Sequence, residues 1–261
     1  MQMRKFALTA IAAAFAVTAF TGGVAKAAGG DQPAPAAQDW SWQGLFGTYD
    51  RAQLQRGFQV YKNICAGCHS LRFIAFRNLE GIGFNEDQIK AIAAEYDIED
   101  GPNDDGDMFT RPGVASDYFP SPFPNEKAAA ASNGGAIPPD LSLMNKARVG
   151  GPDYVFGLLT GYEEEAPEGF DLADGKYYNH YFPGHQISMA PPLYDEAVEY
   201  TDGTPMTLEQ HARDITAFLN WTAQPELEAR KALGMKVILF LLVLTAMMYA
   251  VKRKIWRDIE H

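Results

Sequence analysis

Apolar residues recur every three or four positions in three stretches of the chain. Residues 51–64, 85–96 and 207–223 each place such side chains on one face of a helix, so the spacing predicts three amphipathic helices. The third is the clearest, because Thr207 together with Gln210 fits a capping box at its start.

The segments between these helices show little periodicity. A proline in the first turn predicts a short helix over residues 152–159. Six prolines mark residues 110–139 as a loop, and seven acidic residues mark residues 95–107 as a solvated loop rather than a metal site. Residues 28–39, rich in Pro and Ala, are expected to form a linker. Four large apolar residues are expected to begin the packed core: Trp40, Trp42, Leu45 and Phe46.

The first apolar run lies near the amino terminus. Arg4 and Lys5 precede an uncharged, Ala-rich stretch, residues 6–20, and an Ala-Lys-Ala cleavage pattern follows at residues 25–27. This order is typical of a secretory signal peptide, so residues 1–27 are expected to be cleaved during export.

The second apolar run lies near the carboxyl terminus. Residues 237–251 carry no charge, and as a helix they cover roughly 22 Å, less than the roughly 30 Å hydrocarbon core. A neighbouring lysine can reach the interface, which extends the predicted transmembrane helix to residues 232–251. Three basic residues follow, so residues 252–261 are expected in the cytoplasm and residues 40–231 on the periplasmic side of a bacterial inner membrane.

The charge is distributed unevenly along the chain. The formal net charge is −11, and removing the three cations of the signal and the net +3 of residues 236–261 leaves −17 on the exported domain. Such a domain excludes nucleic acid as a partner and favours a basic protein, because opposite fields steer encounter.

The strongest chemical motif is Cys65-Ala-Gly-Cys68-His69, the C-x-x-C-H attachment site of a c-type haem. Two thiols at this spacing can each add to one vinyl group of the same porphyrin, and His69 then reaches the iron. A redox pair needs no histidine here, and a zinc site needs four ligands, whereas the chain has only two Cys. We therefore expect one covalently attached haem c.

The haem iron needs a sixth ligand. Met189 lies in Ile-Ser-Met-Ala-Pro-Pro, where the prolines restrict the backbone and can hold a thioether in place. His185 lies close by and is the rival candidate. The residue chemistry favours Met189 without excluding His185.

Five longer motifs resemble the cytochrome c1 family, the membrane-anchored haem subunits of cytochrome bc1 complexes. The resemblance covers most of residues 40–256. Its motifs are residues 65–79 (CAGCHSLRFIAFRNL), 137–142 (IPPDLS), 147–162 (ARVGGPDYVFGLLTGY), 178–193 (YNHYFPGHQISMAPPL) and 202 to the end of the membrane helix. The implied fold is mainly α, an enlarged class I c-type cytochrome domain with long loops plus one carboxy-terminal transmembrane helix.

The resemblance also implies roles for individual residues. Met189 matches the family's sixth ligand, in preference to His185. Pro139 matches the proline whose carbonyl accepts the axial histidine's other N–H, a bond that fixes the tautomer. Arg148 and Tyr154 match residues near a haem propionate, although Arg148 could instead only cap a helix.

The implied function is electron transfer within a quinol–cytochrome c oxidoreductase. The chain would accept an electron from the Rieske iron-sulfur protein and pass it to a soluble, basic c-type cytochrome, alongside cytochrome b in a dimeric complex. On its own it would not be an enzyme. The alternatives are a haem subunit of a terminal oxidase or nitric oxide reductase, and a haem c enzyme or gas sensor.

Overall fold

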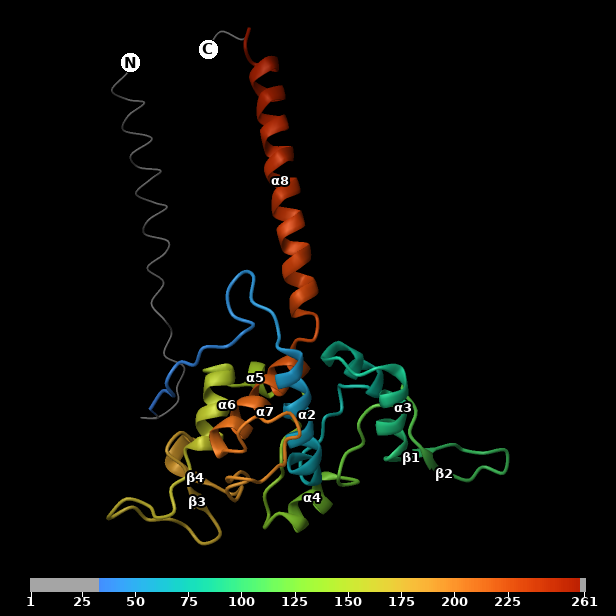
Figure 1. Ribbon diagram of the computed structural model, residues 1–261, viewed down its shortest axis with the longest axis vertical. Coiled ribbons are helices and arrows are strands. Elements are labelled where there is room, and N and C mark those ends of the chain that lie inside the picture. The colour runs from blue at the N-terminus through green and yellow to red at the C-terminus, as the bar shows by residue number, and fades with distance from the viewer. Residues whose placement is uncertain (1–32, 259–261) are drawn as a thin grey trace. The chain divides into compact units, whose positions relative to one another are not determined.

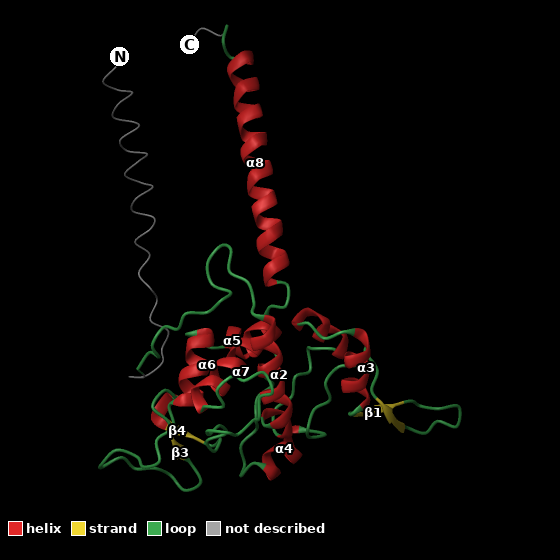
Figure 2. Cartoon of the chain, in the orientation of Figure 1, coloured by secondary structure: helices red, strands yellow, loops and turns green. Residues whose placement is uncertain are grey.

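The computed structural model describes residues 33–258. Helices make up most of the regular structure and long loops join them (Figures 1 and 2). The α-helices are α2 (Arg51–Asn63), α3 (Glu86–Ala94), α4 (Glu126–Ser132), α5 (Met144–Ala147), α6 (Gly151–Thr160), α7 (Leu208–Ala223) and α8 (Leu227–Ile255). Short 3-10 turns are η1 (Cys65–Gly67), η2 (Phe76–Ile82) and η3 (Pro183–His185). Two small antiparallel pairs join β1 (Asp97–Asp100) to β2 (Phe109–Pro112) and β3 (Tyr177–Tyr178) to β4 (Gln186–Ile187). The mainly α fold is therefore confirmed.

The four predicted helices are present as α2, α3, α6 and α7, within a few residues of their expected ends. The capping box predicted for α7 is only half formed. Thr207 accepts a hydrogen bond from the Gln210 amide at 3.2 Å, as expected. The Gln210 side chain instead donates to Asp214 at 2.8 Å, because that buried carboxylate, one turn later, needs donors.

Helix α7 forms the centre of the core. It is buried from His211 to Ala223, apart from half-buried Arg213, and it contacts α2, α5 and α6. The crossing with α2 is close: a Cβ on Gly57 would lie only 2.1 Å from the Asp214 carbonyl oxygen. Only glycine allows α2, which leads into the haem motif, to approach α7 this closely.

Two segments predicted to be loops contain regular structure. Residues 95–107 contribute β1, and the hairpin continues into β2, where Arg111 pairs with Asp100 and Asp117. The Pro-rich segment 110–139 contains α4, whose start is capped by the Asn125 side chain. Neither element has the wide apolar stripe that identifies a helix or strand in sequence, since both are mostly exposed.

The expectation that all four residues at the start of the domain are core is wrong for two of them. Trp40 and Trp42 are buried, stacked with ring centroids 4.9 Å apart, but Leu45 and Phe46 are exposed. A tight turn between them directs the second pair out of the core. Pro35, in the described part of the expected linker, lies against α6 at Gly157.

Helix α8 is long and apolar enough to cross a membrane, and none of its most apolar window is buried. It extends beyond the predicted span at both ends, so it begins within the segment expected to belong to the haem domain. The expected signal peptide, residues 1–27, lies outside the described residues.

Candidate haem c site

Helix α2 positions the C-x-x-C-H motif. Its start is capped by Asp50, which accepts hydrogen bonds from two backbone amides, and the chain then tightens into η1. The His69 and Cys68 amides both donate to the Cys65 carbonyl, at 2.8 and 3.1 Å. Cys65 is half-buried against the core and Cys68 is exposed. The motif is therefore a defined turn that presents both thiols and the imidazole from one short segment.

His69 is fixed by two contacts. Its ring Nδ1 lies 2.8 Å from the Pro139 carbonyl oxygen, and its own carbonyl accepts a hydrogen bond from the Tyr61 hydroxyl at 3.2 Å. Burial lowers the pKa of His69, although the Pro139 bond and the Asp140 charge act in the opposite direction. A neutral imidazole that donates from Nδ1 keeps the Nε2 lone pair for a metal.

Asp140 is a positioning residue that the sequence analysis did not identify. Its carboxylate accepts hydrogen bonds from the Ser70 hydroxyl and the amides of Arg72 and Ser142, at 2.8, 3.0 and 3.0 Å. Burial by itself raises the pKa of Asp140, but these donors outweigh it and the net pKa lies below the usual value. The carboxylate thereby ties the segment carrying Pro139 to the segment that follows His69. Its place within the IPPDLS motif was the available signal.

Met189 lies two residues after β4 and is half-buried. The Tyr162 hydroxyl donates a hydrogen bond to the Met189 carbonyl at 3.1 Å, and Tyr162 itself is bridged to Asn179 beside β3. Tyr162 thus positions the methionine backbone. It lies within a family motif, but the partner of its hydroxyl depends on tertiary structure.

His185, the rival ligand, makes contacts within its own loop. Its Nδ1 lies 3.3 Å from the Asn179 carbonyl oxygen, and its ring stacks on Tyr178 with centroids 5.6 Å apart. These contacts hold the ring within its own loop, and the preference for Met189 over His185 rests on the family resemblance.

Arg148 and Tyr154 are neighbours. Burial raises the pKa of the Tyr154 hydroxyl, and the Arg148 charge acts in the opposite direction. Arg148 is also the carboxy-terminal cap residue of α5, where Nη1 donates to the Ala147 carbonyl at 3.2 Å. The capping alternative is therefore present in the structure. The guanidinium is exposed, and its other N–H groups have no hydrogen-bond partner among the described residues.

The candidate residues form two groups. Cys65, Cys68, His69 and Pro139 lie together, held by Asp140. Arg148 and Tyr154 lie together. Burial raises the pKa of Tyr162, whose hydroxyl bonds the Met189 carbonyl, and the neighbouring Tyr154 raises this pKa further. No hydrogen bond or ring contact between described residues joins His69 to Met189.

The donor set fits a haem c. It offers two thiols for the vinyl groups, an imidazole and a thioether for the iron, and a guanidinium with free N–H groups for a propionate. The segments that carry these groups also expose large apolar side chains, which suit a porphyrin face: Phe73, Ile137, Leu143 and Val149. With one helix able to cross a membrane, these features define a membrane-anchored c-type cytochrome.

Comparisons with known proteins narrow this class. The model of the cytochrome C1 family matches residues 40–259. The chain is 56% identical to a cytochrome c1 of Rhodospirillum rubrum, over 86% of this chain and 88% of that protein. It is 51% identical to a cytochrome b/c1 of Bradyrhizobium diazoefficiens, over 86% of this chain and 36% of that protein. It is 49% identical to a mitochondrial cytochrome c1 of Schizosaccharomyces pombe, over 85% of this chain and 72% of that protein.

The chain belongs to the cytochrome c1 family. It is accordingly a membrane-anchored haem c subunit of a cytochrome bc1 complex, with one covalently attached haem and cytochrome b as a fellow subunit. The complex is an oxidoreductase.

Proposed function

We propose that this chain accepts single electrons from the Rieske iron-sulfur protein and passes them to a soluble, basic c-type cytochrome. The haem supplies the one-electron iron couple. The chain holds that group, sets its ligands and presents it to two partners in turn, and it performs no bond chemistry itself. His69 and Met189 are the proposed axial ligands, and Arg148 and Tyr154 the proposed neighbours of a propionate.

The observation that carries the proposal is the support given to both candidate ligands. The Pro139 carbonyl lies 2.8 Å from His69 Nδ1, and Tyr162 holds the Met189 backbone. A carrier that must not bind small molecules needs both axial positions filled by the protein. Histidine with methionine also suits a high-potential couple, because the soft thioether favours ferrous iron.

We further propose that the haem domain lies on the periplasmic side and that the complex is dimeric. The basic residues after the predicted span support this orientation. The −17 charge of the domain supports a basic electron acceptor.

The alternatives make different predictions. Family membership argues against a subunit of a terminal oxidase or nitric oxide reductase. A haem enzyme or gas sensor needs an open or displaceable sixth position, so it would bind carbon monoxide rapidly when reduced. The proposed carrier should resist carbon monoxide.

The test is gentle purification through an affinity tag on this chain. The preparation should contain b-type haem and the Rieske cluster, and quinol should reduce the haem c of this chain. If the Rieske protein is removed, reduction of haem c should stop while b-type haem remains reducible. Unchanged haem c reduction without the Rieske protein would contradict the proposed route.

A further inference from the structure

A short loop at the start of the domain exposes its apolar residues although its neighbours are buried. This apolar loop comprises residues 41–48. Trp42 within it is 5% exposed, whereas Leu45 and Phe46 at its tip are 56% and 79% exposed. Tyr49, at its end, packs on Trp42 with ring centroids 5.5 Å apart. The base of the loop thus belongs to the core while its tip points away from it.

The loop is held closed by its own backbone. The Thr48 amide donates to the Ser41 carbonyl at 3.1 Å. A Cβ at Gly47 would lie 1.9 Å from the Gln43 carbonyl oxygen, so no other residue fits without moving the backbone. A closed turn of this kind cannot fold Leu45 and Phe46 back into the core. Their exposure therefore follows from the geometry of the loop.

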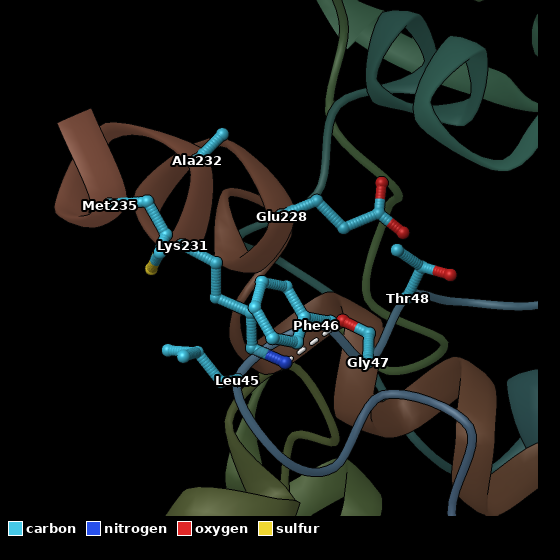
Figure 3. A pocket seen from close by; sticks show the side chains of 8 residues that line it. All are labelled: Leu45, Phe46, Gly47, Thr48, Glu228, Lys231, Ala232 and Met235. Carbon is cyan, nitrogen blue, oxygen red and sulfur yellow. Dashed lines mark hydrogen bonds between the residues drawn. The ribbon is translucent and has the colours of Figure 1, made fainter.

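The same loop is attached to the first turns of α8. Lys231 Nζ donates to the Trp42 carbonyl at 2.7 Å and to the Gly47 carbonyl at 2.9 Å, and Figure 3 shows the second of these bonds. Glu228, one turn earlier, accepts from the Tyr49 amide at 2.7 Å and pairs with Arg51 at 2.5 Å. Glu228 and Lys231, at the start of α8, are thus engaged with the loop and its flanks, and Lys236 is the last charge before the uncharged run.

The loop tip and the start of the predicted span line one shallow hollow of about 190 Å³. Leu45 and Phe46 line one side, and Ala232 and Met235 line the other (Figure 3). Residue 232 is also the first residue of the predicted span. The exposed tip therefore lies beside the residues of α8 where the predicted span begins.

We propose that Leu45 and Phe46 insert into the boundary between lipid headgroups and acyl chains, beside α8. The occupant of this surface is the bilayer itself, because the tip is continuous with the apolar surface of a helix that crosses it. Exposed apolar side chains at this depth lose contact with water on insertion, and the ordered turn loses no conformational freedom in doing so. Two side chains do not anchor a protein, so the contact orients the haem domain on the membrane while α8 retains it.

The experiment uses the full-length haem-loaded chain in phosphatidylcholine vesicles. Cys65 and Cys68 are consumed by the haem, so Phe46→Cys supplies one reactive thiol for a nitroxide label. Leu239→Cys serves as the reference within the span, and Met108→Cys, on the β1–β2 hairpin and 56% exposed, as the reference in water. Continuous-wave spin resonance then measures collision rates with oxygen, which concentrates in lipid, and with a water-soluble nickel chelate.

The oxygen-to-nickel collision ratio of the Phe46 label should be several-fold higher than that of the Met108 label and should lie below that of the deeper Leu239 label. A ratio equal to that at Met108 would overturn the proposal. The measurement is repeated in the purified bc1 complex, where protection from both reagents would show a protein neighbour and would also overturn it. The Leu45→Cys variant provides an independent label, and an unchanged haem spectrum confirms the fold of each variant.

Discussion

Asp140 joins two segments that are far apart in sequence, yet it touches neither proposed ligand. Its hydrogen bonds from Ser70 and Arg72 hold residues 139–142 against residues 70–72, and the Leu141 amide adds a bond to the Ser70 carbonyl at 2.9 Å. The position of the Pro139 carbonyl beside His69 is a consequence of this junction. The geometry of the proximal ligand is therefore set by residues around it as much as by the motif itself.

This junction predicts a pH-dependent effect of Asp140→Asn. The folded pKa of Asp140 is lowered, so its contribution to stability is complete above the unfolded pKa of about 4 and is lost as the pH falls through the folded value. The variant should unfold at lower denaturant concentration than the parent at pH 7, and this difference should shrink as the pH is lowered below 4. Denaturant titrations of the variant and the parent at pH 7 and below pH 4 measure this difference in stability.

Asp104→Asn is the control, because this aspartate is exposed and has no ion pair among the described residues. The Asp104→Asn variant should unfold at nearly the same denaturant concentration as the parent at either pH. A difference between Asp140→Asn and the parent that stays constant down to acid pH would contradict the role given to the carboxylate.

At the level of elements, the α2–α7 crossing carries a buried charge. Asp214 is fully buried and accepts from Gln53, Gln210 and Arg56, the last at 2.8 Å from Nε. Arg56 also pairs with the more exposed Asp202 at 2.8 Å. A buried charge that loses its partner is costly, whereas an exposed pair contributes little.

We therefore expect Arg56→Ala, which leaves the buried Asp214 carboxylate without its cation, to lower the free energy of unfolding by about 3 kcal/mol or more. Asp202→Ala removes the other carboxylate on the same arginine and should have a much smaller effect. Both are measured by denaturant unfolding of the haem-loaded protein. Equal losses for the two variants would show that burial of Asp214 is not what matters at this crossing.

Some of these elements could be predicted from the sequence and others could not. Helix α7 was predictable because its apolar spacing and its Thr207 cap are local signals. Helix α4 was missed because its alanines form no wide stripe and prolines surround it, although Asn125 was an available cap signal. Leu45 and Phe46 were assigned to the core on composition, but their exposure depends on the Gly47 turn and on Lys231, which is distant in sequence.

The residues of the candidate site also divide into those that could be predicted from the sequence and those that could not. The C-x-x-C-H motif identifies its three residues by chemistry alone, and family resemblance supplied Met189, Pro139, Arg148 and Tyr154. The supporting residues Tyr61, Asp140 and Tyr162 could not be assigned, because each acts through a hydrogen bond to a backbone group that only the folded chain brings near.

At the scale of the whole molecule, the negative charge of the domain predicts that association with a basic electron acceptor depends on ionic strength. Charges on the exposed surface interact over about 10 Å at 0.1 M salt and over less at higher salt. The second-order rate of electron transfer to a basic soluble cytochrome should therefore fall as ionic strength rises. Stopped-flow measurement across a salt series tests this, and a flat rate would contradict steering by charge.

The two acidic clusters can be distinguished with variants that remove the same charge. Glu163 follows Tyr162, which bonds the Met189 carbonyl, so the cluster Glu163–Glu165 adjoins the proposed ligand. The cluster Asp104–Asp107 lies on the β1–β2 hairpin, which makes no hydrogen bond or ion pair with a candidate site residue in the described part of the chain. Glu163, Glu164 and Glu165 changed together to Gln should slow the acceptor reaction more than Asp104, Asp105 and Asp107 changed to Asn. The opposite order would place the docking surface on the hairpin.

Electron transfer by the whole molecule depends on Met189 as the proposed sixth ligand of the haem. Met189→Leu removes the thioether and supplies no donor, while the two cysteines keep the haem attached. Axial ligands span about 0.8 V across haem proteins, so the reduction potential should fall by a substantial fraction of that range. Met206→Leu, at a half-buried methionine packed on the core, should leave the potential unchanged.

The decisive measurement is a redox titration of purified Met189→Leu complex, followed by exposure of the reduced protein to carbon monoxide. We expect an assembled complex with a lowered haem c potential, a haem that now binds carbon monoxide, and collapsed quinol-driven turnover. A variant that keeps the parent's potential and remains closed to carbon monoxide would show that Met189 is not the ligand.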